Sequence, residues 1–331
     1  MGKAPAGPVP VVVMGLGHVG REICRAALAF EEVELLGAVD ASPGLSGAPL
    51  SELLGQPSAL RVSGTLAAAA GRSHSAVVLH SGGSRLDQAM DGLLDAVRRG
   101  HPVVSTCEEL CFPYLRHPEL ADRIDRAAQR SGVAVVGTGV SPGFVLDRLV
   151  ATVGQALGPV RHVRATRSVD AATRGETFQR QVGAGLTEEE FAGLADKDAL
   201  GQPGLVESAA LCALGLGMDC DDFEEELVPL IAEEDHPGSP IPVPRGRVAG
   251  VHQTAVGLEG EQERVRLEVT LAVGSASVDR MVLDADTQLT VEIPGGLADE
   301  PARAHLVVHA APRLTQATPG LLTVLDLPAG R

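Results

Sequence analysis

The sequence predicts an α/β protein in which a doubly wound, parallel sheet of the Rossmann type is followed by an α+β domain with an open mixed or antiparallel sheet. In the first part, short apolar runs alternate with amphipathic stretches, and after Ser141 longer strands of alternating polarity follow. With 331 residues, 44% of them hydrophobic, the chain can build two cores. We expect a first domain with the parallel sheet at residues 1–141, an α+β domain at 142–300, and a C-terminal helix and tail at 301–331 that returns to the first domain.

The strands of the first domain are expected at short runs rich in valine and other apolar residues. Such runs are typical of strands buried on both faces of a parallel sheet. Helices are expected between them, where apolar residues recur at helical spacing, as Val19, Ile23 and Ala27 do. The predicted strands are Val11–Met14, Val33–Val39, Ala76–His80, Pro102–Ser105 and Val133–Val136, and the later helices are Leu86–Arg99 and Leu120–Arg130.

The second domain is predicted to mix helices, strands and irregular segments. A long irregular stretch is expected at Asp170–Gly204, an acidic patch at Asp219–Glu226 and a proline- and glycine-rich loop at His236–Arg245. The expected helices are Phe144–Leu157, Leu205–Leu216 and Ala302–Ala311, with Pro312 and Pro319 punctuating the tail, and the expected strands are Val160–Ser168, Arg247–Val256, Arg264–Val273 and Gln288–Ile293.

One of these strands has a two-sided pattern. Its apolar residues Leu267, Val269 and Leu271 alternate with polar ones, so one face of the sheet is apolar and needs a cover. A second copy of the chain would supply that cover, and we therefore expect a homodimer built through this sheet. A helix of the same chain could cover the face instead.

Charge and cysteine usage narrow the class of protein. A formal net charge of −16 argues against nucleic acid as a partner. We expect no membrane span, because no apolar run approaches roughly 20 residues, and no signal peptide. Five cysteines without metal-like spacing indicate reduced thiols, a cytoplasmic protein and no metal site. Only Lys3 and Lys197 are lysines, so a mechanism that needs a catalytic lysine has almost nowhere to place it.

A glycine-rich turn follows the first predicted strand. Gly15, Leu16, Gly17, His18, Val19 and Gly20 form the pattern G-x-G-x-x-G, and an amphipathic stretch comes directly after it. The first glycine permits a tight turn, the second lets the backbone approach a pyrophosphate, and the third lets the helix pack on the strand. The pyrophosphate is expected at the helix N-terminus, where free N–H groups favour an anion. A purely structural glycine turn is the alternative.

Asp40 ends the second predicted strand, 20 positions after Gly20, and is expected to bind the adenosine ribose hydroxyls. A carboxylate there repels a 2′-phosphate, and no lysine or arginine occurs between Arg25 and Arg61 to compensate. The sequence therefore favours NAD(H), with NADP(H) still possible.

Two further loops follow predicted strands at the carboxyl edge of the sheet, where ligands of doubly wound sheets bind. One contains His80 and Ser81, the other Thr106 and Cys107. We expect both loops to border the nicotinamide. For His80, packing at the strand end is an equally good interpretation.

Two motifs resemble a known family: V-V-S-T-C-E-E-L at Val103–Leu110 and G-T-G-V-S-P-G-F at Gly137–Phe144. Both resemble signatures of the 2,4-diaminopentanoate dehydrogenases and of the related native amine dehydrogenases. Further matching segments begin at Val169 and at Gly204, and another lies near the C-terminus at Ala311–Leu322. The resemblance therefore covers nearly the whole sequence. It implies a fold like that of dihydrodipicolinate reductase, with a sheet-based substrate domain.

The resemblance also implies a reaction, in which a ketone or aldehyde condenses with ammonia and the imine takes a hydride from the nicotinamide; deamination is the reverse. It places Glu108 against the substrate as the catalytic residue. A carboxylate in a nearly dry site can accept the proton of ammonium and stabilise the cationic iminium, and burial should raise its pKa. Glu109, its neighbour, should point elsewhere and either cap a helix or face solvent. An N-cap or a structural ion pair is the alternative role for Glu108.

The sequence departs from the family pattern at three positions that bear on the substrate. Ser141 and His309 stand where the family usually has Asn, and Gln202 where it has His. Our other candidates for the pocket wall, each with core packing as the alternative, are Phe144, Phe178, Gln179, His252 and Thr254. Three alternatives remain open: 2,4-diaminopentanoate dehydrogenase proper, another dehydrogenase of the same fold, and a non-catalytic NAD sensor.

Overall fold

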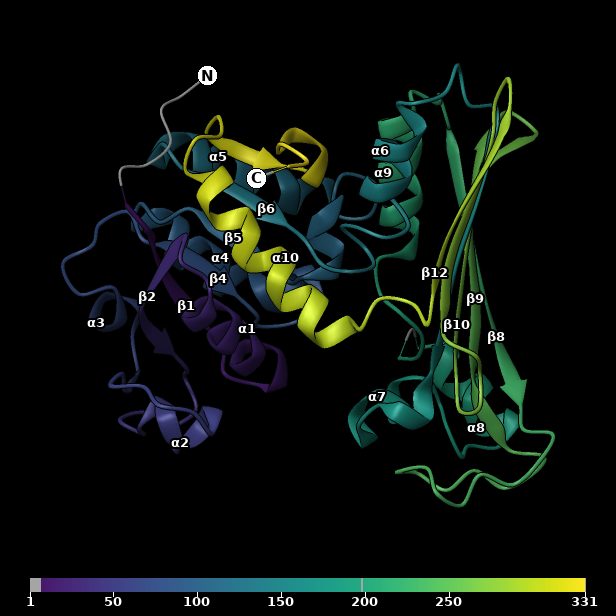
Figure 1. The fold of residues 1–331 in the computed structure, drawn as a ribbon, viewed down its shortest axis with the longest axis horizontal. Helices are drawn as coiled ribbons and strands as arrows, with labels where there is room; N and C mark the ends of the chain where they lie inside the picture. The colour runs from purple at the N-terminus through teal and green to yellow at the C-terminus, as the bar shows by residue number, and fades with distance from the viewer. Residues whose placement is uncertain (1–6, 198, 331) are drawn as a thin grey trace. The chain divides into compact units, whose positions relative to one another are not determined.

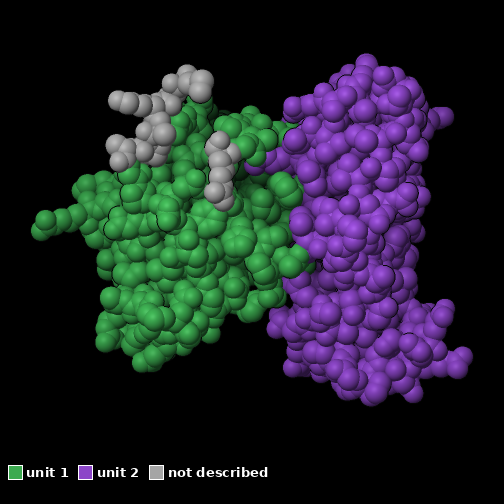
Figure 2. Space-filling model, in the orientation of Figure 1, with its two compact units in different colours: residues 1–144, 298–331 green, residues 145–297 purple. Residues whose placement is uncertain are grey.

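The computed structural model describes residues 7–197 and 199–330. Its contacts divide the chain into two compact units (Figure 2). Unit 1 consists of Met1–Phe144 together with Ala298–Arg331, and unit 2 of Val145–Leu297. The C-terminal segment therefore belongs to the same unit as the N-terminal one. Each unit is built around its own sheet (Figure 1).

Unit 1 contains a seven-stranded sheet in the order β13-β6-β5-β4-β1-β2-β3, and all its neighbouring strands run parallel. The chain leaves the central β1 in one direction for β2 and β3, then crosses over to β4 on the other side of β1. This reversal is the switch point at which such sheets bind ligands. The doubly wound parallel sheet is confirmed. The strands are β1 Val9–Met14, β2 Val33–Val39, β3 Val62–Ser63, β4 Val77–His80, β5 Val103–Ser105, β6 Ala134–Gly137 and β13 Gly320–Leu322.

Helices cover both faces of this sheet. Val12 belongs to a core cluster shared with α3, α4 and α5, whereas its neighbours Val11 and Val13 point to the other side, where α1 and α10 lie against each other (Figure 1). All three valines are fully buried. The helices of unit 1 are α1 His18–Ala29, α2 Leu50–Leu54, α3 Leu66–Ala70, α4 Leu86–Arg98, α5 Pro118–Ser131 and α10 Asp299–Leu314, with 3₁₀ turns η1 Glu108–Cys111 and η3 Val324–Asp326.

Unit 2 contains a six-stranded mixed sheet in the order β12-β11-β7-β10-β9-β8. Only β7 and β10 pair in parallel; the other neighbours are antiparallel. The mixed sheet is therefore confirmed as well. Its strands are β7 His162–Asp170, β8 Asp222–Ile231, β9 Val248–Glu259, β10 Gln262–Ala272, β11 Val278–Asp284 and β12 Gln288–Pro294, and its helices are α6 Arg148–Gly154, α7 Glu176–Gln181, α8 Glu188–Ala195 and α9 Leu205–Leu216, with the 3₁₀ turn η2 Ala171–Thr173.

Several elements differ from the prediction. The acidic stretch from Asp219 is mostly strand β8, an edge strand with exposed glutamates, and charge on an edge discourages pairing with other chains. The helix predicted at Phe144–Leu157 is only Arg148–Gly154, and the segment expected to be irregular holds η2, α7 and α8. Strand β11 and the short elements between Asp40 and Ala76 were not predicted. Pro312 lies inside α10, not in the tail beyond it.

The apolar face of the unit 2 sheet is covered by a helix of the same chain. Val265, Leu267 and Val269 are fully buried, and α9 contacts β8, β9 and β10. This is the alternative to a dimer that the strand pattern left open. The opposite face is polar; there Arg164 forms a two-bond contact with Glu268. In the described part of both units, no helix combines the length and the apolar character needed to cross a bilayer.

Candidate active site

The glycine-rich turn between β1 and α1 has the geometry of a dinucleotide site. Gly15 has a φ of +94°, which side chains disfavour. A Cβ added to Gly20 would lie 1.8 Å from the Gly15 carbonyl oxygen, so only glycine lets α1 approach this closely. The first and third glycines therefore have the roles that the motif predicts.

Gly17 is different, because a Cβ there would meet nothing within 4 Å. It precedes α1, whose first turn has no acidic residue and no side-chain cap. The helix start thus offers free N–H groups beside open space, which fits a pyrophosphate. Leu16 is buried in this turn and Val19 is half-buried, whereas His18 is exposed and its Nε2 lies 2.8 Å from a carboxylate oxygen of Glu300 in α10.

Asp40 joins the end of β2 to this turn. Its Oδ2 accepts a hydrogen bond from the Leu16 N–H at 2.7 Å, and its Oδ1 accepts one from the Ser42 N–H at 2.8 Å. Burial raises the pKa of Asp40, but these hydrogen bonds and the positive charge of Arg21 outweigh it, so the pKa lies below its ordinary value. Arg21 lies in α1, before the stretch between Arg25 and Arg61 that has no cation, and its effect on Asp40 was not predicted. Arg61 binds the Gly47 carbonyl oxygen at 2.7 Å.

Ser81, which directly follows β4, is hydrogen-bonded to the glycine-rich turn. Its N–H donates to the Met14 carbonyl at 2.8 Å, and its hydroxyl donates to the Gly15 carbonyl at 2.9 Å. The structure thus brings Ser81 to the glycine-rich turn, next to where the sequence placed the cofactor.

His80 is a packing residue. Its side chain is almost fully buried, and its Nδ1 lies 2.9 Å from the Ser105 hydroxyl. The ring also fills space at two glycines, since a Cβ at Gly82 or at Gly92 of α4 would come within 3.0 Å of Nε2. Burial lowers the pKa of His80 to about 4, so the ring is neutral. The side chain therefore has the packing role that the sequence left open, and a contact of this loop with the cofactor stays a prediction.

Thr106 and Cys107 hold the second loop to the sheet. The Thr106 N–H donates to the His80 carbonyl at 2.9 Å, and the Cys107 thiol donates to the Ser84 carbonyl at 3.2 Å. Cys107 is fully buried, and burial raises the pKa of its thiol well above the ordinary value. It is therefore an unreactive structural cysteine.

Glu108 begins the 3₁₀ turn after β5 and keeps 13% of its side chain exposed. Its Oε1 lies 3.9 Å from Nη1 of Arg303, and the Ser84 side chain hydrogen-bonds to it. Burial raises the pKa of Glu108, while the charge of Arg303 and the bond from Ser84 act in the opposite direction. The result is a partly desolvated carboxylate with a raised pKa at the carboxyl edge of the sheet.

Glu109 turns into the core instead. Its Oε2 accepts a hydrogen bond from the Leu86 N–H at 2.7 Å and lies 3.1 Å from Nε2 of His117, and its Oε1 lies 3.7 Å from Nη1 of Arg85. A carboxylate at the first residue of α4 satisfies a free N–H and complements the helix dipole. Of the two roles predicted for Glu109, the structure shows the cap.

Arg303 is the functional candidate that sequence reasoning missed. It lies in the helix predicted at Ala302–Ala311, almost 200 positions after Glu108, and nothing in its local pattern separates it from a solvent-facing arginine. The only available signal was the expectation that the C-terminal helix returns to the first domain.

The predicted pocket residues are distributed over both units. Ser141, which precedes a cis-proline, and Phe144 lie in unit 1, the former buried and the latter half-buried. Gln179 of unit 2 is fully buried; its amide donates to the Ala171 carbonyl and accepts a hydrogen bond from the Ser239 hydroxyl. These hydrogen bonds of Gln179 are structural, which agrees with core packing, the alternative to a place in the pocket wall.

The other unit 2 candidates lie in α7, before the start of α9, and on β9. Gln202 is bound through its main chain by the side chain of Gln253, which points to the α9 side of the sheet. His252 and Thr254 flank Gln253 on β9 and so point to the opposite side, where His252 contacts Thr270 at 3.0 Å. Gln253 therefore lies on the face of the sheet opposite to His252 and Thr254, and the place of Gln202, His252 and Thr254 in a substrate pocket stays a prediction. Phe178 lies under the guanidinium of Arg174, 4.8 Å from it.

Comparisons with known proteins agree with this architecture. A family model described as the 2,4-diaminopentanoate dehydrogenase C-terminal domain matches residues 144–331. Over 98% of its length the chain is 26% identical to the 2,4-diaminopentanoate dehydrogenase of Acetoanaerobium sticklandii, of which it covers 94%. Over 46% of its length it is 31% identical to an amine dehydrogenase of Streptomyces virginiae, of which it covers 44%.

Among solved structures, the chain is similar to the amine dehydrogenase from Mycobacterium smegmatis, with a TM-score of 0.85 and 21% identity, over 99% of this chain and 98% of that one. The family model spans more than half of the sequence, and its relatives are dehydrogenases. The expected family is confirmed: this chain is an oxidoreductase that belongs to the 2,4-diaminopentanoate dehydrogenase family.

Proposed function

We propose that this oxidoreductase interconverts a carbonyl compound plus ammonia with a primary amine, using a nicotinamide dinucleotide as the hydride carrier. In the aminating direction the carbonyl compound and ammonium together lose water to give an iminium ion, which would be reduced by the hydride that a bound dinucleotide supplies. The observation that carries the proposal is the position of Glu108, a largely desolvated carboxylate at the carboxyl edge of a dinucleotide-binding sheet.

Glu108 has two tasks in this scheme. At the start its Oε atoms accept the proton that ammonium must lose to become a nucleophile. Glu108 then returns this proton to the hydroxyl group of the addition product, which leaves as water, and the carboxylate, ionised again, stabilises the positive charge of the iminium. Both tasks gain from burial, because a raised pKa makes the group a better base and a low local dielectric strengthens its attraction for a cation.

The cofactor is expected along the glycine-rich turn, and Asp40 supports NAD(H) as the preferred form. The carboxylate of Asp40 is held ionised near the turn by two main-chain N–H groups. A second negative charge on the ribose would be repelled there. The positive charge of Arg21 acts on Asp40, so Arg21 is the residue that we expect to make NADP(H) acceptable.

A specific observation favours a second candidate, the oxidation of an amino acid such as a 2,4-diamino acid. Arg303 places a positive charge 3.9 Å from the negative charge of Glu108, and its side chain is 23% exposed. A substrate that carries both an ammonium and a carboxylate would complement such a pair. A simple amine without a carboxylate would use only Glu108.

The test is a turnover assay with NADH, ammonia and a panel of ketones and aldehydes, each offered with and without a carboxylate. NADH consumption that requires ammonia, with the primary amine identified by mass spectrometry, is the expected result. Consumption independent of ammonia would make the protein a carbonyl reductase and overturn the proposal. NADH binding without turnover on any substrate in either direction would favour the sensor alternative.

A further inference from the structure

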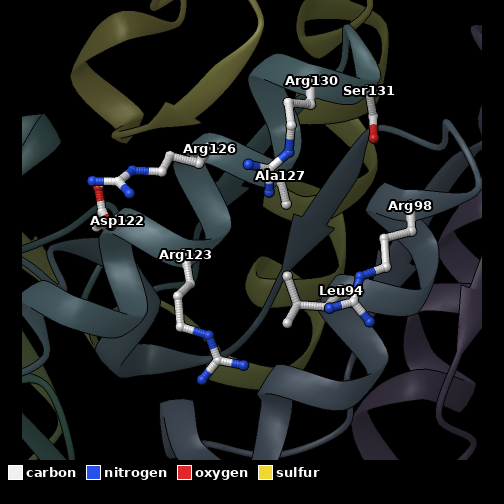
Figure 3. Close-up of a pocket in the computed structure, with 8 residues that line it drawn as sticks. All are labelled: Leu94, Arg98, Asp122, Arg123, Arg126, Ala127, Arg130 and Ser131. Atoms are coloured by element: carbon white, nitrogen blue, oxygen red, sulfur yellow. The ribbon is translucent and has the colours of Figure 1, made fainter.

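A groove on unit 1 gathers positive charge in a strongly acidic protein. It has a volume of about 380 Å³ and lies between α4 and α5 (Figure 3). Four arginines face one aspartate there, an excess of three positive charges, although the chain as a whole carries −16. The groove is lined by Leu94, Arg98, Asp122, Arg123, Arg126, Ala127, Arg130 and Ser131.

Three of the four arginines have no counter-ion in the described part of the chain. Arg126 is paired with Asp122 of its own helix at 2.7 Å. By contrast, the side chains of Arg98, Arg123 and Arg130 form no hydrogen bond or ion pair with any of residues 7–197 and 199–330. Like charges brought together in this way repel one another until an anion neutralises them.

Helical spacing brings these side chains to one place. Arg123 and Arg130 lie seven positions apart, two turns along one face of α5, and Arg98 lies one turn beyond Leu94 on α4. Leu94 and Ala127 are buried and form an apolar floor. In Figure 3 the three unpaired arginines surround that floor, while Arg126 stands aside with Asp122.

We propose that this groove binds a small anion with two or more linked phosphate groups. The guanidinium is planar and donates in pairs to phosphate oxygens, so arginines from two helices can hold adjacent phosphates at once. The volume is that of a small-molecule site. The same chemistry is offered by inorganic polyphosphate and by a phosphorylated metabolite such as a nucleoside triphosphate, whose organic part would lie on the apolar floor.

The groove is distinct from the cofactor site. The first turn of α4 is capped by Glu109 at the carboxyl edge of the sheet, and the helix then runs back to Arg98, ahead of the start of β5. Likewise α5 ends at Ser131, ahead of β6. The unpaired arginines at the ends of both helices thus lie toward the amino edge, away from the glycine-rich turn.

A simpler interpretation is that arginines near helix C-termini complement the helix dipoles. It accounts for Arg98 and Arg130, which lie in or beside the last turns of their helices. It does not account for Arg123, which lies in the middle of α5, or for the hollow that all three surround.

The test is calorimetric titration of the full-length protein, saturated with NADH to occupy the glycine-rich turn, with sodium tripolyphosphate at low ionic strength. We expect saturable binding that weakens as NaCl is added. The double variant R123Q/R130Q should raise the Kd at least about tenfold, because two of the three free charges are lost. Glutamine is nearly as good a helix former as arginine, so the fold is retained.

The variant R99Q is the matched control. Arg99 adjoins Arg98 on the same helix, but it is paired with Asp95 at 2.8 Å and does not line the groove. The Kd of R99Q for tripolyphosphate should stay within about twofold of the wild-type value, because an exposed charge that is already paired contributes little. Absence of saturable binding, equal weakening in R99Q, or an unchanged Kd in R123Q/R130Q would each overturn the proposal.

Two further titrations identify the source of the phosphates. ATP binding more tightly than tripolyphosphate would indicate a phosphorylated metabolite, and the reverse order would indicate inorganic polyphosphate; both results support the site. Adenosine, which lacks phosphate, should not bind, and adenosine binding as well as ATP would count against a phosphate site.

Discussion

The carboxylate of Glu109 accepts a hydrogen bond from the main-chain N–H of Leu86 at 2.7 Å, and this contact separates the roles of two adjacent glutamates. Glu109 is committed to the N-terminus of α4, where Arg85 provides no side-chain cap of its own. Glu108, one position earlier, is largely buried, keeps 13% of its side chain exposed, and has its Oε1 3.9 Å from Nη1 of Arg303. One glutamate of the pair is therefore structural and the other is available for chemistry.

The variant Glu109→Gln should lose stability but keep its turnover per folded molecule. The amide oxygen can still accept from Leu86, but the negative charge facing His117 and Arg85 is lost from a buried site. We expect the free energy of unfolding to fall by about 1–3 kcal/mol, measured by urea denaturation. A kcat reduced as strongly as in a Glu108 variant would contradict this division of roles.

The variant Glu108→Gln should show the opposite behaviour. It keeps the side-chain volume but removes the proton acceptor and the negative charge, so reductive amination should fall by roughly 10²–10⁴. NADH affinity and the urea midpoint should remain near wild type, because the glycine-rich turn is untouched. Steady-state kinetics measures the rate of reductive amination and NADH fluorescence titration the cofactor affinity. Glu109→Gln is the control at the adjacent position. If both variants lose activity equally and modestly, the base is a different residue.

The glycine-rich turn was predictable because its signal is local. Strand, turn, helix and Asp40 lie within one short stretch, and each glycine acts on its near neighbours. The same holds for most strands of unit 1, whose valine runs need no distant information. Strand β8 was missed because none of its residues is fully buried, so its glutamates hide the alternation that marks a half-buried strand.

The remaining site residues depend on contacts that sequence spacing cannot show. Arg303 comes close to Glu108 only because α10 returns to unit 1, and Arg21 acts on Asp40 from the preceding helix. For His80 the sequence left two interpretations open. The choice between them rests on Gly82 and Gly92, whose missing side chains leave room for its ring.

Cofactor preference gives the next prediction. Because Asp40 is ionised beside the turn, NADH should be used at least as well as NADPH, and steady-state kinetics with both cofactors decides it. If NADPH is also accepted, Arg21 is the expected reason. The variant Arg21→Gln should then lower kcat/KM for NADPH more than for NADH. A strong NADPH preference that survives this variant would contradict both statements.

The homodimer remains a prediction, but on different grounds. The apolar face of the unit 2 sheet is covered by α9, whereas the opposite face is polar and carries the ion pair between Arg164 and Glu268. A dimer through this polar face would depend on charge and weaken in high salt. Light scattering at micromolar concentration, in low and in high salt, tests it. A stable monomer in both would refute the dimer.

The burial of His80 predicts how the stability of the protein depends on pH. Burial lowers its pKa to about 4 in the folded protein, against 6.5 for an ordinary histidine. As the pH falls below 6.5, the unfolded chain binds a proton that the folded protein does not, so stability is lost. Between pH 7 and pH 5 this loss should amount to about 2 kcal/mol.

The variant His80→Asn isolates this contribution, since asparagine can still meet the Ser105 hydroxyl but does not titrate. Its absolute stability should be lower than that of wild type at pH 7, because the smaller side chain leaves a cavity beside Gly92. Its further loss on going to pH 5 should nevertheless be smaller by about 2 kcal/mol, because the carboxylates contribute equally to both proteins. Urea denaturation of both proteins at pH 7, 6 and 5 gives the comparison. Parallel pH profiles would mean that the ring is protonated in the folded state at pH 5, and hence that it is not enclosed by the core.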